Sequence, residues 1–190
     1  MSKKLTRENQ INFVLEYIKP LLQQNNVKDA RLITVLGLSG KHDIDLSDDD
    51  RIEIVTWMYK NLGPTLYFKD STTIFPYEFS YYVDRTFIIP ETIQTIQQYA
   101  FSESNIRKII IPKNVHAIGM GAFSESSITE VIFENFSNVK LDAGVFVDSD
   151  LEIIYVEDNA DKSALNEFHI RIPSVHIISA STGEVLIEAE

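Results

Sequence analysis

The segment IPETIQTIQQYAFSESN (residues 89–105) is followed 22 residues later by IPKNVHAIGMGAFSESS (residues 111–127). The two segments share an Ile-Pro pair, an isoleucine seven residues further on, and the ending Ala-Phe-Ser-Glu-Ser. The next step is 23 residues and leads from Phe123 to Phe146. A regular period of this length indicates stacked supersecondary units, each of which forms one coil of a solenoid.

A second pattern, of three apolar residues spaced apolar-x-x-apolar-x-apolar, follows each phenylalanine. Side chains alternate between the two faces of a strand, so the inward residues of successive coils stack into a column. Phe101, Phe123 and Phe146 are expected to form a second buried column on the opposite side, and the Ser-Glu-Ser turns to face water. The apolar triplets are Ile106, Ile109, Ile111, then Ile128, Val131, Phe133, then Leu151, Ile154, Val156.

These segments resemble the BspA-like leucine-rich repeats, which occur in many bacteria and in some protists and phages. The resemblance covers residues 85–156 and extends to IYVEDNADKSALNEF (154–168), which is similar to the last coil and closing segment of that family. It implies a right-handed β-solenoid with few helices and a role in binding. Many relatives are surface adhesins, so family analogy also implies surface exposure. Ser104, Ser126 and Ser149 stand where the family often has cysteine.

Residues 1–65 read as helical. The first predicted helix is capped by Thr6, is bent or interrupted at Pro20 and ends at Asn25-Asn26. The second runs from Asp29 to Leu36 and stops at Gly37. The stripe of the first helix comprises Ile11, Val14, Tyr17, Ile18, Leu21 and Leu22.

A third helix is predicted to be capped by Ser47, because three acidic residues follow it where the helix dipole favours them. Gly63-Pro64 are expected to end it. Its predicted buried side comprises Ile52, Ile54, Val55, Trp57, Met58 and Leu62.

The sequence therefore predicts an α+β protein in which a small N-terminal helical cap precedes a short leucine-rich-repeat β-solenoid closed by a C-terminal β-hairpin. The predicted regions are a helical region (1–65), a strand-rich connection (66–84), the repeats (85–168) and a capping hairpin (169–190). The hairpin consists of strands at 175–180 and 184–188 around a Ser-Thr-Gly turn. It either caps the open end of the solenoid or extends a sheet, and capping is favoured.

The net charge of −11 is concentrated in residues 81–190, which carry 7 basic against 17 acidic residues. Such a surface repels phosphates, so we expect no nucleic-acid partner. The chain has no cysteine. No signal peptide or membrane span is legible, which predicts a cytoplasmic protein without a membrane partner.

No constellation of residues indicates catalysis, a cofactor or a metal. His42, His116, His169 and His176 do not have the spacing of metal ligands. The acidic run at 43–50 departs from a calcium-binding loop at its sixth and twelfth positions, and is better explained as a helix N-terminus. A non-enzymatic protein is therefore expected, although an enzyme with a site in the helical region stays open.

The outward positions of the strands suggest where a partner binds. One outward position is large and apolar in every coil: Ile88, Ile110, Ile132 and Tyr155. The turns add an acidic column, Glu103, Glu125 and Asp148, as a rim. We interpret the protein as a protein–protein interaction module. The same face could hold a homo-oligomer of a structural or assembly component, or be covered by the chain itself.

Overall fold

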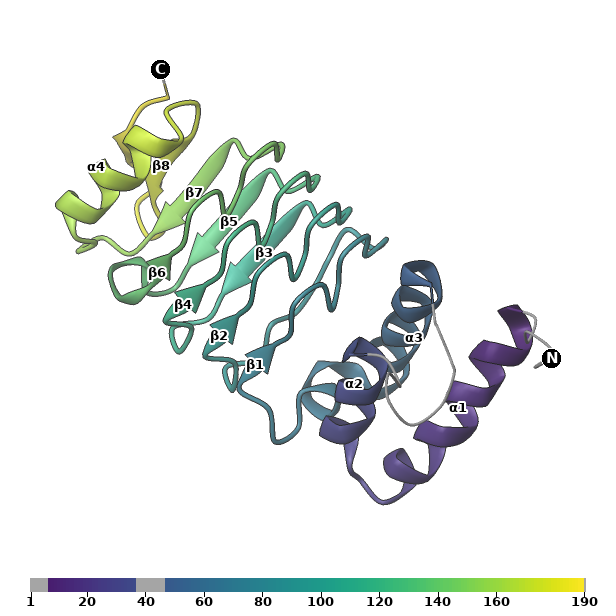
Figure 1. Ribbon diagram of the computed structural model, residues 1–190. Coiled ribbons are helices and arrows are strands. Elements are labelled where there is room, and N and C mark those ends of the chain that lie inside the picture. Colours follow the sequence, from purple (N-terminus) through teal and green to yellow (C-terminus); the bar gives the residue numbers. More distant parts are fainter. Residues whose placement is uncertain (1–6, 37–46, 190) are drawn as a thin grey trace. The chain divides into compact units, whose positions relative to one another are not determined.

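Figure 1 shows the computed structural model, which describes residues 7–36 and 47–189. The chain divides into two compact units, Met1–Ser71 and Thr72–Glu190. The described part of the first unit is helical, and the second contains the strands. The α+β class and the solenoid of short parallel strands that the sequence predicts are confirmed.

The first unit contains α1 (Arg7–Gln23), α2 (Val27–Leu36) and α3 (Asp48–Tyr67). Arg31 of α2 is fully buried, and its guanidinium carbon lies 4.8 Å from the ring centroid of Tyr67 and 4.6 Å from that of Phe68. A cation held over aromatic faces away from water contributes about 2 kcal/mol. The apolar core of the unit includes Ile18, Val27, Ala30, Ile54, Val55 and Met58.

The helix ends differ in part from the predicted ones. Of the two effects expected at Pro20, a bend or an interruption, the interruption does not occur, because α1 continues to Gln23. The carbonyl that loses its partner there is that of Glu16, an exposed residue that water can solvate. Helix α2 begins at Val27 rather than Asp29. Thr6 and Gly37 lie outside the described residues.

Helix α3 begins where the sequence places it. The Ser47 hydroxyl accepts a hydrogen bond of 3.3 Å from the Asp50 N–H, as an N-cap should. The predicted end at Gly63 is only a kink, with φ at 72°, and one more helical turn follows to Tyr67.

The predicted burial of Trp57 in α3 is wrong, since this side chain is 43% exposed. Ile54, Val55, Met58 and Tyr59 form the buried stripe, and Trp57 projects from the other side of the helix. The apolar character of Trp57 therefore misled the sequence-based assignment.

The second unit is a ladder of two sheets. The first sheet joins β1 (Thr73–Ile74), β2 (Thr95–Ile96), β4 (Ala117–Ile118) and β6 (Lys140–Leu141), all in parallel. The second joins β3 (Lys108–Ile111), β5 (Glu130–Phe133), β7 (Ile153–Val156), β8 (His176–Ser179) and β9 (Val185–Ile187). Figure 1 shows these strands side by side along the solenoid. A short 3₁₀ helix, η1 (Phe136–Asn138), lies before β6.

The coils stack in the register that the sequence predicts. Phe101, Phe123 and Phe146 are buried and stacked, with ring centroids 5.1 Å and 5.4 Å apart. Phe79 extends this column at 5.5 Å from Phe101. A further coil therefore lies within the segment assigned above to a strand-rich connection. The inward strand residues are also buried as predicted: Ile109, Ile111, Val131, Phe133, Ile154 and Val156.

The Ser-Glu-Ser turns were predicted to face water, and for their serines this prediction is wrong. Ser124 and Ser126 are 4% and 2% exposed, and only Glu125 between them is exposed. The Ser126 hydroxyl donates a 2.7 Å hydrogen bond to the carbonyl of Phe123, and Ser149 does the same to Phe146. Ser124 and Ser126 are thus buried side chains that bond to carbonyls of the turn backbone, whereas the buried Ser104 hydroxyl has no hydrogen-bond partner within the described residues.

Two residues in each turn adopt a left-handed backbone. Tyr77, Tyr99, Gly121 and Gly144 lie two residues before each phenylalanine, and Tyr81, Glu103, Glu125 and Asp148 lie two residues after it, with φ between 53° and 61°. The Tyr99 ring lies above Gly121, where an added Cβ would be only 2.5 Å from the ring. Glycine at this position therefore satisfies both the backbone and the tyrosine above it.

Backbone hydrogen bonds link each turn to the next coil. Phe101 donates its N–H to the carbonyl of Ala122 at 2.8 Å, and Glu103 donates to that of Ser124 at 2.9 Å. The following turn repeats the pattern, with Phe123 donating to Val145 at 2.8 Å and Glu125 to Val147 at 2.9 Å. Every turn thus provides two donors that point towards the C-terminal end of the solenoid.

The C-terminal end contains a helix that the sequence analysis missed. Helix α4 (Lys162–Arg171) is capped by Asp161, which accepts a 2.8 Å hydrogen bond from the Ser163 N–H. Its Phe168 packs edge-on against Phe146 at 6.4 Å. Strand β8 then joins β7 in parallel and so extends the sheet, and β9 pairs antiparallel with β8.

Glu157 ties the last coil to the one before it. Its carboxylate accepts hydrogen bonds from the N–H groups of Phe136 at 2.7 Å and Ser137 at 3.0 Å. Partial burial by itself would raise the pKa of Glu157, but these bonds to the charged form outweigh it and lower the pKa below its usual value.

None of the helices in residues 7–36 and 47–189 combines the length and the apolar character that a membrane span requires.

Candidate interaction surface

Parallel pairing places large apolar residues in one row on the outer face of the second sheet. Ile110 pairs with Ile132, Ile132 with Tyr155, and Tyr155 with Ile178. The bridge between Thr86 and Lys108 places Ile88 level with Ile110. We call Ile88, Ile110, Ile132, Tyr155 and Ile178 the outward row.

The outward row is accessible along its whole length. Ile88 is 63% exposed and Ile110 48% exposed, whereas Ile132, Tyr155 and Ile178 are half-buried. Beyond Ile178 the row continues to its antiparallel partner Val185, which is 42% exposed. The C-terminal strands therefore lengthen this apolar strip instead of covering it.

A mixed row runs beside the outward row. Lys108 forms a 2.7 Å ion pair with Glu130, and its ammonium lies 5.6 Å from the centroid of the Tyr155 ring. The hydrogen bond to Glu130 raises the pKa of Lys108. Exposed pairs of this kind contribute less than about 1 kcal/mol.

Glu103, Glu125 and Asp148 are exposed at equivalent left-handed positions of successive turns. The N–H of Glu103 bonds to the turn that contains Glu125, and the N–H of Glu125 bonds to the turn that contains Asp148. The three carboxylates therefore form one column. Arg107 lies along the chain between Glu103 of this column and Ile110 of the outward row, and its guanidinium is 3.6 Å from Asp150.

Sequence reasoning missed Ile178 and the first coil. The first coil has a readable signal, because TIFPYEF (73–79) and TIQQYAF (95–101) share T-I-x-x-Y-x-F at a spacing of 22 residues. Ile178 follows Ile177 as Ile110 follows Ile109, but the parallel pairing that aligns it with Tyr155 is not visible in the sequence.

Histidine, aspartate and glutamate side chains do not gather into a metal site in the described ranges. Within residues 7–36 and 47–189, no three His, Asp or Glu side chains come together in a way that could hold a metal ion. His176 accepts a hydrogen bond from the Ala189 N–H at 3.2 Å and lies 3.1 Å from Glu188. His42, Asp43 and Asp45 lie outside the described residues.

A family model described as BspA type leucine rich repeat region (6 copies) matches residues 65–179, which is more than half of the chain. The chain belongs to the BspA-type leucine-rich repeat family. Leucine-rich repeats are modules typically used in protein binding, and the family is usually non-catalytic. Searches of curated proteins and of solved structures found no match.

Proposed function

We propose that this BspA-type repeat protein is a non-enzymatic module that binds a partner protein through its outward row, centred on Ile110, Ile132 and Tyr155. The observation that carries the proposal is the register of these side chains across successive parallel strands. An outward strand position has no structural need for a large apolar group, whereas a binding face does.

The size of the apolar strip supports this role. Burying a fully exposed isoleucine contributes about 1.5–3 kcal/mol, and the half-buried members contribute less because part of their area is already covered. Association also orders side chains, which offsets part of the gain. A partner that covers the whole row nevertheless gains enough to bind specifically through a few central residues.

The charges around the strip favour a partner with a basic border. Residues 81–190 are strongly acidic, and Glu103, Glu125 and Asp148 lie in an exposed column. Complementary charges on a partner would increase the rate of association more than the final affinity. The same charges disfavour nucleic acid, whose phosphates they repel.

The test is the substitution Ile110→Asp, which introduces an unpaired charge in the centre of the proposed contact. Thr86→Asp is the matched control, because it places the same charge at an exposed position of the neighbouring row. Affinity capture from the native cell should recover a protein with the wild type and with Thr86→Asp, but not with Ile110→Asp.

Circular dichroism and thermal unfolding establish that both variants fold. A folded Ile110→Asp protein that still retains the partner would overturn the proposal, as would an Ile110→Asp protein that unfolds, since the row would then be buried by the chain itself. Light scattering on the pure protein identifies the alternative occupant. A wild-type oligomer that Ile110→Asp converts to a monomer would assign the row to a second copy of the chain.

A further inference from the structure

The last turn of the solenoid has two backbone N–H groups whose equivalents in the preceding turns bond to the next coil. In those turns the N–H of the phenylalanine and that of the residue two positions later bond to the next coil. The equivalent groups here are the N–H of Phe146 and of Asp148. Within residues 7–36 and 47–189, neither has a hydrogen-bond acceptor. Backbone N–H groups that lack a protein partner are readily bonded by a ligand.

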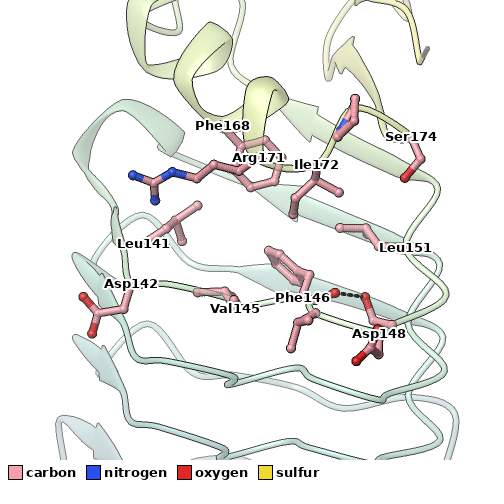
Figure 2. A pocket seen from close by; sticks show the side chains of 14 residues that line it. Leu141, Asp142, Val145, Phe146, Asp148, Leu151, Phe168, Arg171, Ile172 and Ser174 are labelled. Carbon is pink, nitrogen blue, oxygen red and sulfur yellow. Dashed lines mark hydrogen bonds between the residues drawn. The ribbon is translucent and has the colours of Figure 1, made fainter.

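A pocket of about 350 Å³ lies beside these donors. It opens between the last turn and the segment that follows α4, and Figure 2 shows Phe146 and Leu151 on one side with Phe168 and Ile172 on the other. Val147 lines the pocket and is 49% exposed. We call this cavity the end pocket. Its size falls at the lower end of the range of about 300–1,000 Å³ that is typical of binding pockets.

The spacing of the two donors indicates what they recognise. In the turn above, Phe123 and Glu125 donate to the carbonyls of Val145 and Val147, the residues before and after Phe146. The side chain between those two carbonyls is the one that enters the core. The N–H groups of Phe146 and Asp148 therefore have the spacing to donate to two carbonyls of another polypeptide that flank one inward-pointing apolar residue.

The charges at the end pocket favour basic neighbours in that polypeptide. Asp142 and Asp148 line the pocket and are exposed. The guanidinium of Arg171, which also lines it, is 2.7 Å from the carboxylate of Glu167. The charge of Arg171 is thus already compensated within α4, which leaves an acidic border on the last turn.

We propose that the end pocket binds a short segment of a partner polypeptide, in which a bulky apolar residue enters the pocket, its two flanking carbonyls accept from Phe146 and Asp148, and basic residues face Asp142 and Asp148. The segment adds to the last turn of the solenoid beside Phe168, whose ring already lies 6.4 Å from that of Phe146. The segments of this chain outside the described residues, 1–6, 37–46 and 190, contain bulky aliphatic residues such as Leu5 and Leu38 but no Phe, Tyr or Trp, the ring type that fills the inward position of the preceding turns. This site is independent of the outward row.

The test uses the full chain labelled with ¹⁵N and the capped peptide Lys-Ala-Phe-Ser-Lys. We expect saturable shifts of the Phe146 and Asp148 amide resonances and slower hydrogen exchange at both. Replacing the phenylalanine of the peptide by alanine should weaken binding by about tenfold or more, because the apolar side chain is no longer buried. A peptide with glutamate in place of both lysines should bind more weakly still than the original.

Two protein variants locate the site. Ser174→Trp fills the pocket from an exposed position and should abolish binding. Asp148→Asn removes one charge but keeps a residue that accepts the left-handed backbone, and should weaken binding without loss of stability. Ile110→Asp should leave peptide binding unchanged.

Shifts confined to other residues, absence of binding by the wild type, or full binding by Ser174→Trp would each overturn the proposal. Self-association of the wild type that Ser174→Trp abolishes would also overturn it, because the occupant would then be a second copy of this chain.

Discussion

Ile109 and Ile110 are neighbours in β3, yet Ile109 is 1% exposed and Ile110 is 48% exposed. Both belong to columns that continue through β5 and β7, the first to Val131 and Ile154, the second to Ile132 and Tyr155. The inward column is buried between the coils, whereas the outward column is exposed at Ile110 and half-buried at Ile132 and Tyr155. The same residue type in one strand therefore serves stability on one face and, we propose, association on the other.

The largest loss of stability is expected for Phe123→Ala, at the centre of the inward side. Phe123 is stacked between Phe101 and Phe146, so its removal leaves a cavity with aromatic walls on both sides. Such a truncation costs about 3–5 kcal/mol. Urea unfolding followed by circular dichroism measures it, and a loss below about 1 kcal/mol would show that the column is not a continuous core.

Ile109→Ala and Ile110→Ala form a matched pair. We expect Ile109→Ala to lower the free energy of unfolding by about 2–5 kcal/mol, and Ile110→Ala to change it by less than about 0.5 kcal/mol. Partner binding should show the reverse order, measured at a temperature at which both variants are folded. Equal losses of stability would remove the distinction between the two faces.

Glu157→Gln tests a link between coils that depends on pH. The folded-state pKa of Glu157 is lowered, so its stabilisation is complete above the unfolded-state pKa and is lost as the pH falls through the folded value. The variant should therefore be less stable at pH 7, by about 1 kcal/mol since the site is partly solvated. The difference should shrink below about pH 4.5. A difference that stays constant between pH 7 and pH 3 would contradict this.

The smallest effect is expected for Glu125→Lys. Glu125 is exposed and lies outside the outward row, so the folded state should tolerate the change. Association with a basic-bordered partner should slow by a factor on the order of two, with a weaker dependence on salt. Stopped-flow measurements at two ionic strengths, with Glu125→Gln as the uncharged control, test whether the acidic column increases the rate of association.

The repeated core was predictable because its signal is local and periodic. The phenylalanines and the apolar triplets keep their spacing, and burial follows from alternation along a strand. The first coil was missed because Tyr81 stands where the later turns have an acidic residue, Glu103, Glu125 or Asp148. The turn serines were placed in water on account of their polarity, although a hydroxyl that bonds a nearby carbonyl can be buried.

Features that depend on distant partners could not be predicted. The strand at β8 was expected, but its pairing with β7 aligns Ile178 with Tyr155 across 23 residues, and nothing in the sequence sets that register. Helix α4 lies in a segment without a clear apolar stripe, and its Phe168 packs against Phe136 and Phe146, which are distant in the sequence. The N–H groups of Phe146 and Asp148, which have no acceptor among the residues that the structure describes, are recognised only when the turns are compared in three dimensions.

The contact between the Tyr99 ring and Gly121 gives the coils an order. The turns around Phe79, Phe101 and Phe123 make the same backbone bonds to the next coil, so by hydrogen bonding alone any of these coils could be duplicated or exchanged with another. The ring of Tyr99, however, needs a neighbour without a side chain above it or another flat ring, as Tyr77 provides on its other face. A gene rearrangement that placed a coil with a branched residue after the Tyr99 coil would therefore create a clash. Further coils can therefore be inserted at some junctions between coils and not at others.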